Sequence, residues 1–86
     1  MPRFVDSMAS REGRFALGTD MVSGQPYLSI PVSNRLADYE EYYRLTDSER
    51  VVFESDMVLA AAFAAKCRRR EMDDRLILPP GADRGN

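Results

Sequence analysis

Residues 14–32, RFALGTDMVSGQPYLSIPV, contain two short runs in which apolar residues alternate with small or polar ones. The alternating apolar positions are Phe15 and Leu17 in the first run and Leu28, Ile30 and Val32 in the second. A period of two is typical of β-strands with one buried face. Ser23-Gly24 lies between the runs and indicates a turn. The stretch therefore predicts a β-hairpin with a loop of four to six residues.

Two prolines mark the second run of this hairpin. Pro26 and Pro31 have no backbone N–H to donate, so the second strand is expected to be an edge strand or to face solvent at those positions. A lone hairpin is marginally stable in water, so its apolar face needs a cover from elsewhere in the chain. Residues 1–13 show no clear periodicity and are predicted to be a loose lead-in.

Capping boxes predict where helices begin, because an N-cap side chain and a glutamate three residues later each bind the other's backbone N–H. Asp38-Tyr39-Glu40-Glu41 has this form and predicts a short helix over residues 39–44. Thr46-Asp47-Ser48-Glu49 is a second box and predicts a helix that ends at about Glu54.

A third helix is predicted from Met57 to about Met72, starting behind Ser55-Asp56. The second and third helices could also be one continuous helix. Leu59, Phe63 and Cys67 are spaced four residues apart and so share one helical face. We expect Leu28, Ile30 and Val32 of the hairpin to pack against Leu59 and Phe63.

The predicted fold class is α+β, with a β-hairpin packed against two or three helices. Residues 75–78 could add a third strand or return to the core as an extended segment. Residues 14–78 are then a single domain, and residues 79–86 are a polar tail that begins with Pro79-Pro80-Gly81.

Charge changes sign along the second half of the chain. Between Leu36 and Val58 there are seven acids against Arg44 and Arg50 only. The next charged stretch, residues 66–75, is mainly basic, and the 86-residue chain has a formal net charge of −2. A local acidic block is a plausible recognition surface for a basic partner.

Composition excludes many kinds of active site. The chain has no histidine, so Ser-His-Asp and Cys-His catalysis and histidine-based zinc sites are impossible. The single cysteine, Cys67, allows no internal disulfide framework and no cysteine-rich metal site, and its helical spacing indicates a core residue. No glycine-rich phosphate loop is present. We therefore expect a protein without catalytic residues, cofactor or metal.

Location follows from the same features. The longest apolar stretch, residues 57–65, is far shorter than the roughly twenty residues that a membrane helix needs. Asp6 lies where a secretion signal would need apolar residues. The lone cysteine is typical of a reducing compartment, so a soluble cytoplasmic protein is expected.

The acidic block also carries three tyrosines. Tyrosine is common at the energetic centre of protein interfaces, and an acidic rim speeds association with basic partners. The predicted partner-binding residues are Asp38, Tyr39, Glu40, Glu41, Tyr42, Tyr43, Asp47 and Glu49. The alternative interpretation is that the tyrosines fill a small core and that the acids form a solvated helix face.

Arg68-Arg69-Arg70 raises the question of nucleic-acid binding. Consecutive arginines on a helix point in different directions, and three acids follow within four residues. Phosphate binding generally needs a larger unopposed basic stripe, so the sequence favours a helix end whose cations complement the helix dipole.

Three segments together resemble small bacterial proteins of the immunity type, which are encoded beside secreted toxins. These segments are Tyr27–Val32, Asp38–Tyr43 and Cys67–Asp74. The resemblance implies a class, a protein that binds and blocks an effector, and assigns no functional residue.

We therefore expect a non-enzymatic binding protein, most concretely an immunity or antitoxin-type inhibitor whose acidic segment 38–56 covers a basic site on a toxin. One alternative is a homo-oligomeric accessory or structural subunit, for example a homodimer. The other is a small nucleic-acid-binding regulator that uses residues 68–70.

Overall fold

The computed structural model describes residues 2–33 and 38–79. Over these residues the chain forms four strands, then two α-helices and a 3-10 helix. The strands are β1 (Phe4–Ser10), β2 (Phe15–Asp20), β3 (Pro26–Ser33) and β4 (Asp38–Arg44). The helices are α1 (Asp47–Ser55), α2 (Met57–Arg68) and the 3-10 helix η1 (Asp73–Arg75). The α+β class is confirmed, with a larger sheet than the predicted hairpin.

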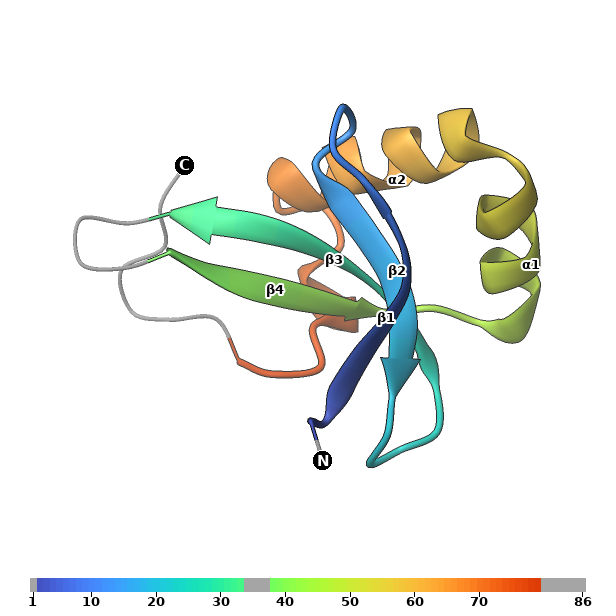
Figure 1. Cartoon of the computed structure of the whole chain (residues 1–86). Coiled ribbons are helices and arrows are strands. Elements are labelled where there is room, and N and C mark those ends of the chain that lie inside the picture. Colours follow the sequence, from blue (N-terminus) through green and yellow to red (C-terminus); the bar gives the residue numbers. More distant parts are fainter. Residues whose placement is uncertain (1, 34–37, 80–86) are drawn as a thin grey trace.

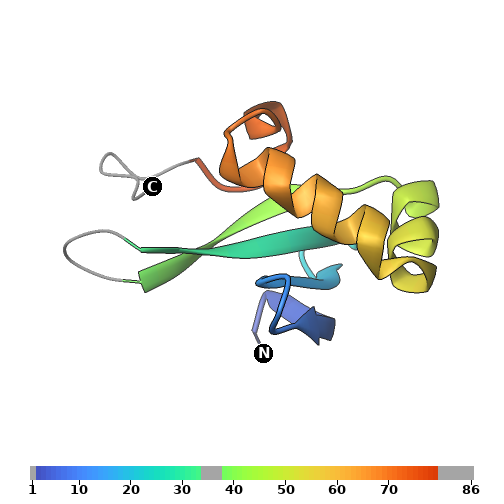
Figure 2. The same ribbon diagram turned by 90° about the horizontal axis from the view of Figure 1, so that it is seen from above.

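The sheet is an antiparallel meander in the order β1-β2-β3-β4. Helix α2 lies across one face of this sheet, and α1 closes one end of it (Figure 1). Figure 2 shows that β1 lies on the opposite side of the β3–β4 ribbon from α2. We call the face of the sheet away from α2 the helix-free face.

The predicted hairpin is present as β2 and β3. Leu17 pairs with Leu28 and Ala16 with Ser29, which places the apolar positions of both strands on the face that α2 covers. Gly24 in the loop has a φ of 76°, a conformation that glycine adopts without the steric cost of a Cβ atom.

Residues 1–13 were predicted to be a loose lead-in, and this prediction is wrong for Phe4–Ser10, which form β1. The pairing with β2 shifts register between Asp6 and Met8, so Ser7 is an extra residue in the ladder. A bulge of this kind breaks the alternation of side chains along a strand. The period of two is therefore absent from the sequence although the strand is present.

The second strand of the hairpin is not an edge strand, because β3 lies between β2 and β4. Leu45 N donates to Pro26 O (3.0 Å), so the even-numbered residues of β3 face β4 and Pro31 faces the β2 side. Pairing with β2 stops at Ser29. The missing N–H of Pro31 therefore faces no partner strand, and Pro26 is the first residue of the strand. Both are positions where sheets tolerate proline.

The helix predicted over residues 39–44 is also wrong, since these residues belong to β4. The strand pairs with β3 from Tyr27↔Arg44 to Ser33↔Asp38. Long-range pairing therefore overrides the local capping pattern at Asp38. The tyrosines of this segment favour a half-buried strand over a helix.

The two later helices start where their caps predict. Thr46 and Glu49 form a complete capping box at the start of α1. Asp56 accepts from Val58 N (3.0 Å) and Leu59 N (3.3 Å) and starts α2, so the two helices are separate. Helix α2 ends at Arg68, four residues before the predicted end.

The main core lies between the sheet and the two helices. It contains Leu28 and Ile30 of the hairpin, Phe53 of α1, and Phe63 and Cys67 of α2, with Val32 partly buried beside them. Leu59, predicted to join this core, is 47% exposed. After η1, Leu76 forms an isolated bridge to Tyr43, and Ile77 N donates to Tyr42 O (2.9 Å).

Of the two forms predicted for residues 75–78, the extended segment that returns to the core is therefore the one observed. Its first residue, Arg75, belongs to η1. The predicted polar tail lies outside the described residues except for Pro79. Among the helices within residues 2–33 and 38–79, none is long and apolar enough to cross a membrane.

Candidate functional site

The eight predicted partner-binding residues do not share one surface, because six of them belong to a strand. Side chains alternate along β4, so Asp38, Glu40 and Tyr42 lie on the helix-free face. Tyr39, Glu41 and Tyr43 lie on the opposite face, toward the helices.

Two of the predicted residues are inside the protein. Tyr43 is fully buried, and its hydroxyl donates to Glu41 Oε1 (2.7 Å), which is also buried. These side chains stabilise the layer between sheet and helices and are not accessible to a partner. For Tyr43, the interpretation that the tyrosines fill a small core is confirmed.

Aromatic rings from three strands meet on the helix-free face. Tyr42 stacks on Phe4 of β1, with ring centroids 3.7 Å apart, and meets Tyr27 of β3 edge-on at 5.0 Å. The Tyr27 hydroxyl donates to Asp6 Oδ1 (2.6 Å). Burial raises the pKa of the Glu40 carboxyl, and the nearby charge of Asp6 raises it further. This face therefore pairs a small aromatic cluster with exposed acids.

Sequence reasoning missed Asp6 and Phe4 as members of this face. Both lie on β1, the strand that carried no recognisable period. Nothing local links β1 to the tyrosines of β4, since the two strands are at opposite edges of the sheet.

The two predicted residues on α1 differ in accessibility. Asp47 is exposed at the start of the helix. Glu49 accepts from Thr46 N (2.8 Å) and from Arg75 Nη1 (2.5 Å). Although burial opposes ionisation of Glu49, these bonds lower its pKa overall. Glu49 therefore holds α1 to the segment around η1, and Asp47 remains available to a partner.

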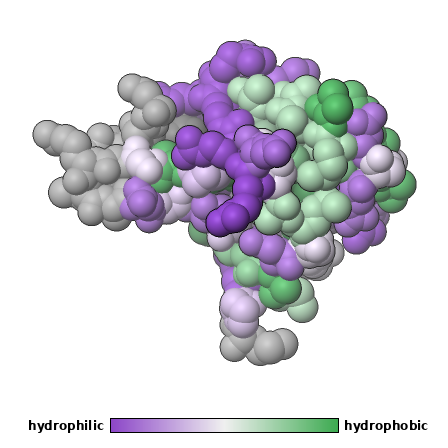
Figure 3. Space-filling model, turned by 45° about the horizontal axis from the view of Figure 1, so that its top comes forward, coloured by the Kyte–Doolittle hydropathy of each residue, from purple (hydrophilic) through white to green (hydrophobic). Residues whose placement is uncertain are grey.

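Several exposed apolar side chains lie on α1 and on the start of α2, and we call this region the α1–α2 corner. Its apolar residues are Val51, Val52, Met57, Val58 and Leu59. Val58 is 77% exposed and Val51 60% exposed. The exposed acids Asp47 and Glu54 lie on α1, and Asp56 lies between the two helices. Figure 3 shows strongly apolar surface at this end of the molecule.

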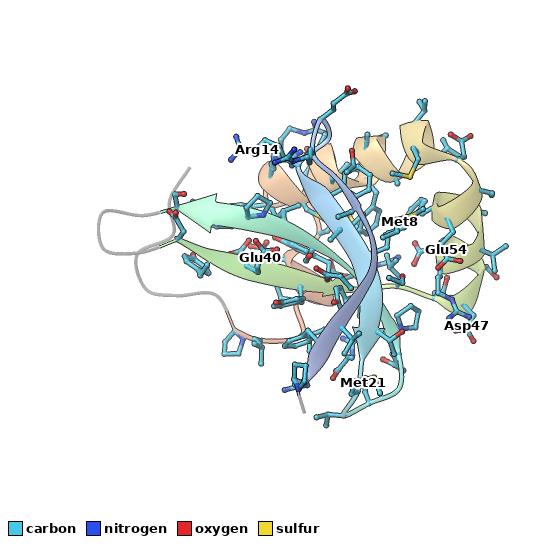
Figure 4. The ribbon with its side chains drawn as sticks, in the orientation of Figure 1. Met8, Arg14, Met21, Glu40, Asp47 and Glu54 are labelled. Carbon is cyan, nitrogen blue, oxygen red and sulfur yellow. The ribbon has the colours of Figure 1, made fainter. Side chains whose placement is uncertain are left out.

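The corner was missed because its signal is ambiguous in the sequence. Val51, Val52 and Leu59 could each have faced a core, since exposure depends on where the sheet meets each helix. Figure 4 shows Asp47 and Glu54 on α1, apart from Glu40 on β4. The acidic block 38–56 is thus split between two surfaces.

The chemistry available at these surfaces is limited. Among residues 2–33 and 38–79, no group of three or more Cys, Asp or Glu side chains is arranged to hold a metal ion. Cys67 is buried, and burial raises the pKa of its thiol to about 12. A thiol with such a pKa is not a nucleophile near neutral pH. What the surfaces offer is charge, aromatic area and apolar area.

Comparison with protein-family models, with curated proteins and with solved structures finds no match to this chain.

Proposed function

We propose that this chain is a non-enzymatic cytoplasmic binding protein, most concretely a bacterial immunity or antitoxin-type inhibitor that covers a basic site on a toxin. The observation that carries the proposal is the α1–α2 corner, an exposed apolar cluster among acids. Soluble proteins rarely leave contiguous apolar patches exposed unless the patch binds something.

The corner has the composition of a protein interface. Such interfaces have an apolar centre that is buried on binding and a polar rim that remains wet. Val51, Val58 and Leu59 would supply the centre, and Asp47 and Glu54 would supply the rim. Burial of the centre provides affinity, and the acids provide orientation and a fast encounter.

The charge of the rim favours a basic partner over a second copy of the chain. In a twofold-symmetric dimer each patch meets itself, so both halves of the interface would carry the same acidic charge. Like charges brought together in an interface are unfavourable. A basic groove, such as the substrate site of a nuclease, would instead neutralise Asp47, Glu54 and Asp56.

The corner is also held rigidly, which lowers the entropy lost on binding. The ring of Phe53 on α1 packs against Phe63 on α2, with centroids 5.3 Å apart. Asp56 ends α1 and caps α2, so a single residue separates the two helices. A blocking protein with this frame needs no rearrangement to present its surface.

The test is binding to the toxin encoded by the neighbouring gene, measured by calorimetry with three proteins. We expect Asp47→Asn/Glu54→Gln at the corner to weaken binding at least about tenfold, because it removes two rim charges. The matched control, Asp38→Asn/Glu40→Gln on the helix-free face, removes the same charge and should stay within about twofold of the wild type.

Three results would contradict the proposal. If the wild type neither binds the toxin nor protects cells from it, the inhibitor function is wrong. If the control variant alone loses binding, the surface is the helix-free face. If light scattering shows a dimer that Val58→Asp dissociates, the corner is a self-association surface.

A further inference from the structure

Two basic segments that are far apart in the sequence come together at the other end of α2. The β1–β2 turn carries Arg11 and Arg14, and the last turn of α2 carries Lys66 and Arg68. Arg68 Nη2 donates to Gly13 O (2.8 Å) and to Arg14 O, so its guanidinium ties the helix end to the turn. In Figure 4, Arg14 lies beside the C-terminal part of α2.

Backbone structure sets this arrangement. In the turn, Gly13 N donates to Ser10 Oγ (2.9 Å), and Arg14 has a φ of 55°. At the helix end, Glu71 N donates to Lys66 O (3.0 Å) across a residue of positive φ, Arg70. This is the pattern of a Schellman cap. Hydrogen-bonded backbone thus fixes both segments that carry the basic side chains, the β1–β2 turn and the end of α2.

The resulting surface, which we call the basic end, is strongly polarised. It comprises Arg11, Arg14, Lys66, Arg68 and Arg69, with Glu12 and Glu71. Its formal net charge is +3, so the remainder of the chain carries −5. Arg69 pairs with Glu71 (2.6 Å), whereas none of Arg11, Arg14, Lys66 and Arg68 forms an ion pair with another described residue.

The basic end lacks the apolar centre of a protein interface. Within the described residues, none of the large exposed hydrophobic side chains lies in residues 11–14 or 66–71. Figure 3 shows strongly polar surface over the β1–β2 turn. Binding to a nucleic-acid backbone needs no such centre, because the release of condensed counterions supplies most of its free energy. The composition thus favours a phosphate backbone over an acidic protein.

We infer that the basic end binds the phosphate backbone of nucleic acid without reading its sequence. Arginine predominates over lysine here, and the planar guanidinium matches phosphate geometry with paired hydrogen bonds. The four cations that form no ion pair could neutralise about three phosphates, which corresponds to a slope of log K against log salt of about −2 to −3. The inference is independent of the proposed function, which uses the opposite end of α2.

The test is fluorescence anisotropy of a labelled 20-nucleotide single strand and of the matching duplex, between 50 and 200 mM NaCl. The double variant Arg11→Gln/Arg14→Asn should reduce the magnitude of the slope by about two. It should also weaken binding at 50 mM NaCl about tenfold or more. Asparagine is chosen at position 14 because it tolerates a positive φ. Circular dichroism confirms that the variants fold.

The matched control is Arg44→Gln, which removes one exposed arginine from the helix-free face, and it is compared with Arg11→Gln alone. We expect Arg11→Gln to weaken binding and Arg44→Gln to leave it within about twofold. No binding to either oligonucleotide at 50 mM NaCl would overturn the inference, as would equal losses in the two single variants. A poly-glutamate peptide that binds more tightly than the oligonucleotides would assign the basic end to an acidic protein instead.

Discussion

Gly18 shows how a residue without a side chain lets side chains from two non-adjacent strands meet. It lies between Asp6 of β1 and Tyr27 of β3 in the pairing of the sheet. A Cβ atom added here would lie 2.2 Å from Val5 O and 2.4 Å from the Tyr27 hydroxyl oxygen. Because glycine leaves this space open, the Tyr27 hydroxyl can cross β2 and reach Asp6.

We predict that Gly18→Ala destabilises the protein by about 1–3 kcal/mol or more, the usual cost of overpacking. The backbone oxygen of Val5 cannot move aside without shifting β1. The control is Gly24→Ala, where no atom lies within 4 Å and the cost is the positive φ alone, about 1 kcal/mol. Urea denaturation measures both, and an equal or smaller loss at Gly18 would show that β1 yields easily.

Asp20 joins the N-terminus of β1 to the hairpin loop. Its carboxylate accepts from Arg3 Nε (2.9 Å), Val22 N (3.0 Å) and Ser23 Oγ (2.9 Å), and it is almost fully buried. The bonds from Arg3 hold its pKa well below the usual range, against the opposing effect of burial.

This lowered pKa predicts acid sensitivity. A carboxyl whose folded pKa lies below its unfolded value of 3.8 stabilises the fold above about pH 4, and the contribution is lost as the pH falls through the folded value. Asp20→Asn should therefore lower Tm at pH 7, and the difference from the wild type should shrink between about pH 4 and pH 2. Thermal melts across this range test the expectation, and a pH-independent difference would contradict it.

At the scale of elements, burial changes along one face of α2. Phe63 and Cys67 face the sheet, whereas Leu59, one turn earlier on the expected apolar face, is half exposed at the α1–α2 corner. The buried stripe therefore starts after Leu59, and helical spacing alone overstates its length.

The contrast between these two side chains is measurable. Phe63→Ala should cost about 3–5 kcal/mol, because it removes a buried ring that packs on Phe53. That loss would unfold much of a domain this small. Leu59→Ala should cost less than about 1 kcal/mol, as exposed positions usually do. Urea midpoints compare the two, and similar losses would mean that Leu59 belongs to the core.

At the scale of the whole molecule, α2 separates two surfaces of opposite charge. The helix has 12 residues and so spans about 18 Å at 1.5 Å per residue. The acidic, apolar α1–α2 corner lies at its start and the basic end lies at its finish. Salt weakens any association through either surface, because both depend on charge. Salt alone therefore does not separate the two proposed activities. Substitutions at one end, with the other end intact, do separate them.

The sequence determined those features whose signals act within a few residues. The alternation in residues 15–17 and 28–32 predicted the β2–β3 hairpin, and the caps at Thr46 and Asp56 predicted both helix starts. The absence of histidine is enough by itself to exclude histidine-dependent catalytic and zinc sites.

Tertiary structure alone decided the rest, because strand pairing joins residues that are distant in the sequence. Pairing with β3 made a strand of residues 38–44 despite their capping pattern, and it buried Glu41 and Tyr43 while leaving Glu40 exposed. The bulge at Ser7 concealed β1 from any periodic pattern. Likewise, the basic end exists only because Arg68 reaches the turn that begins 57 residues before it, at Arg11. Such contacts depend on the closure of long loops, for which no local sequence pattern is a guide.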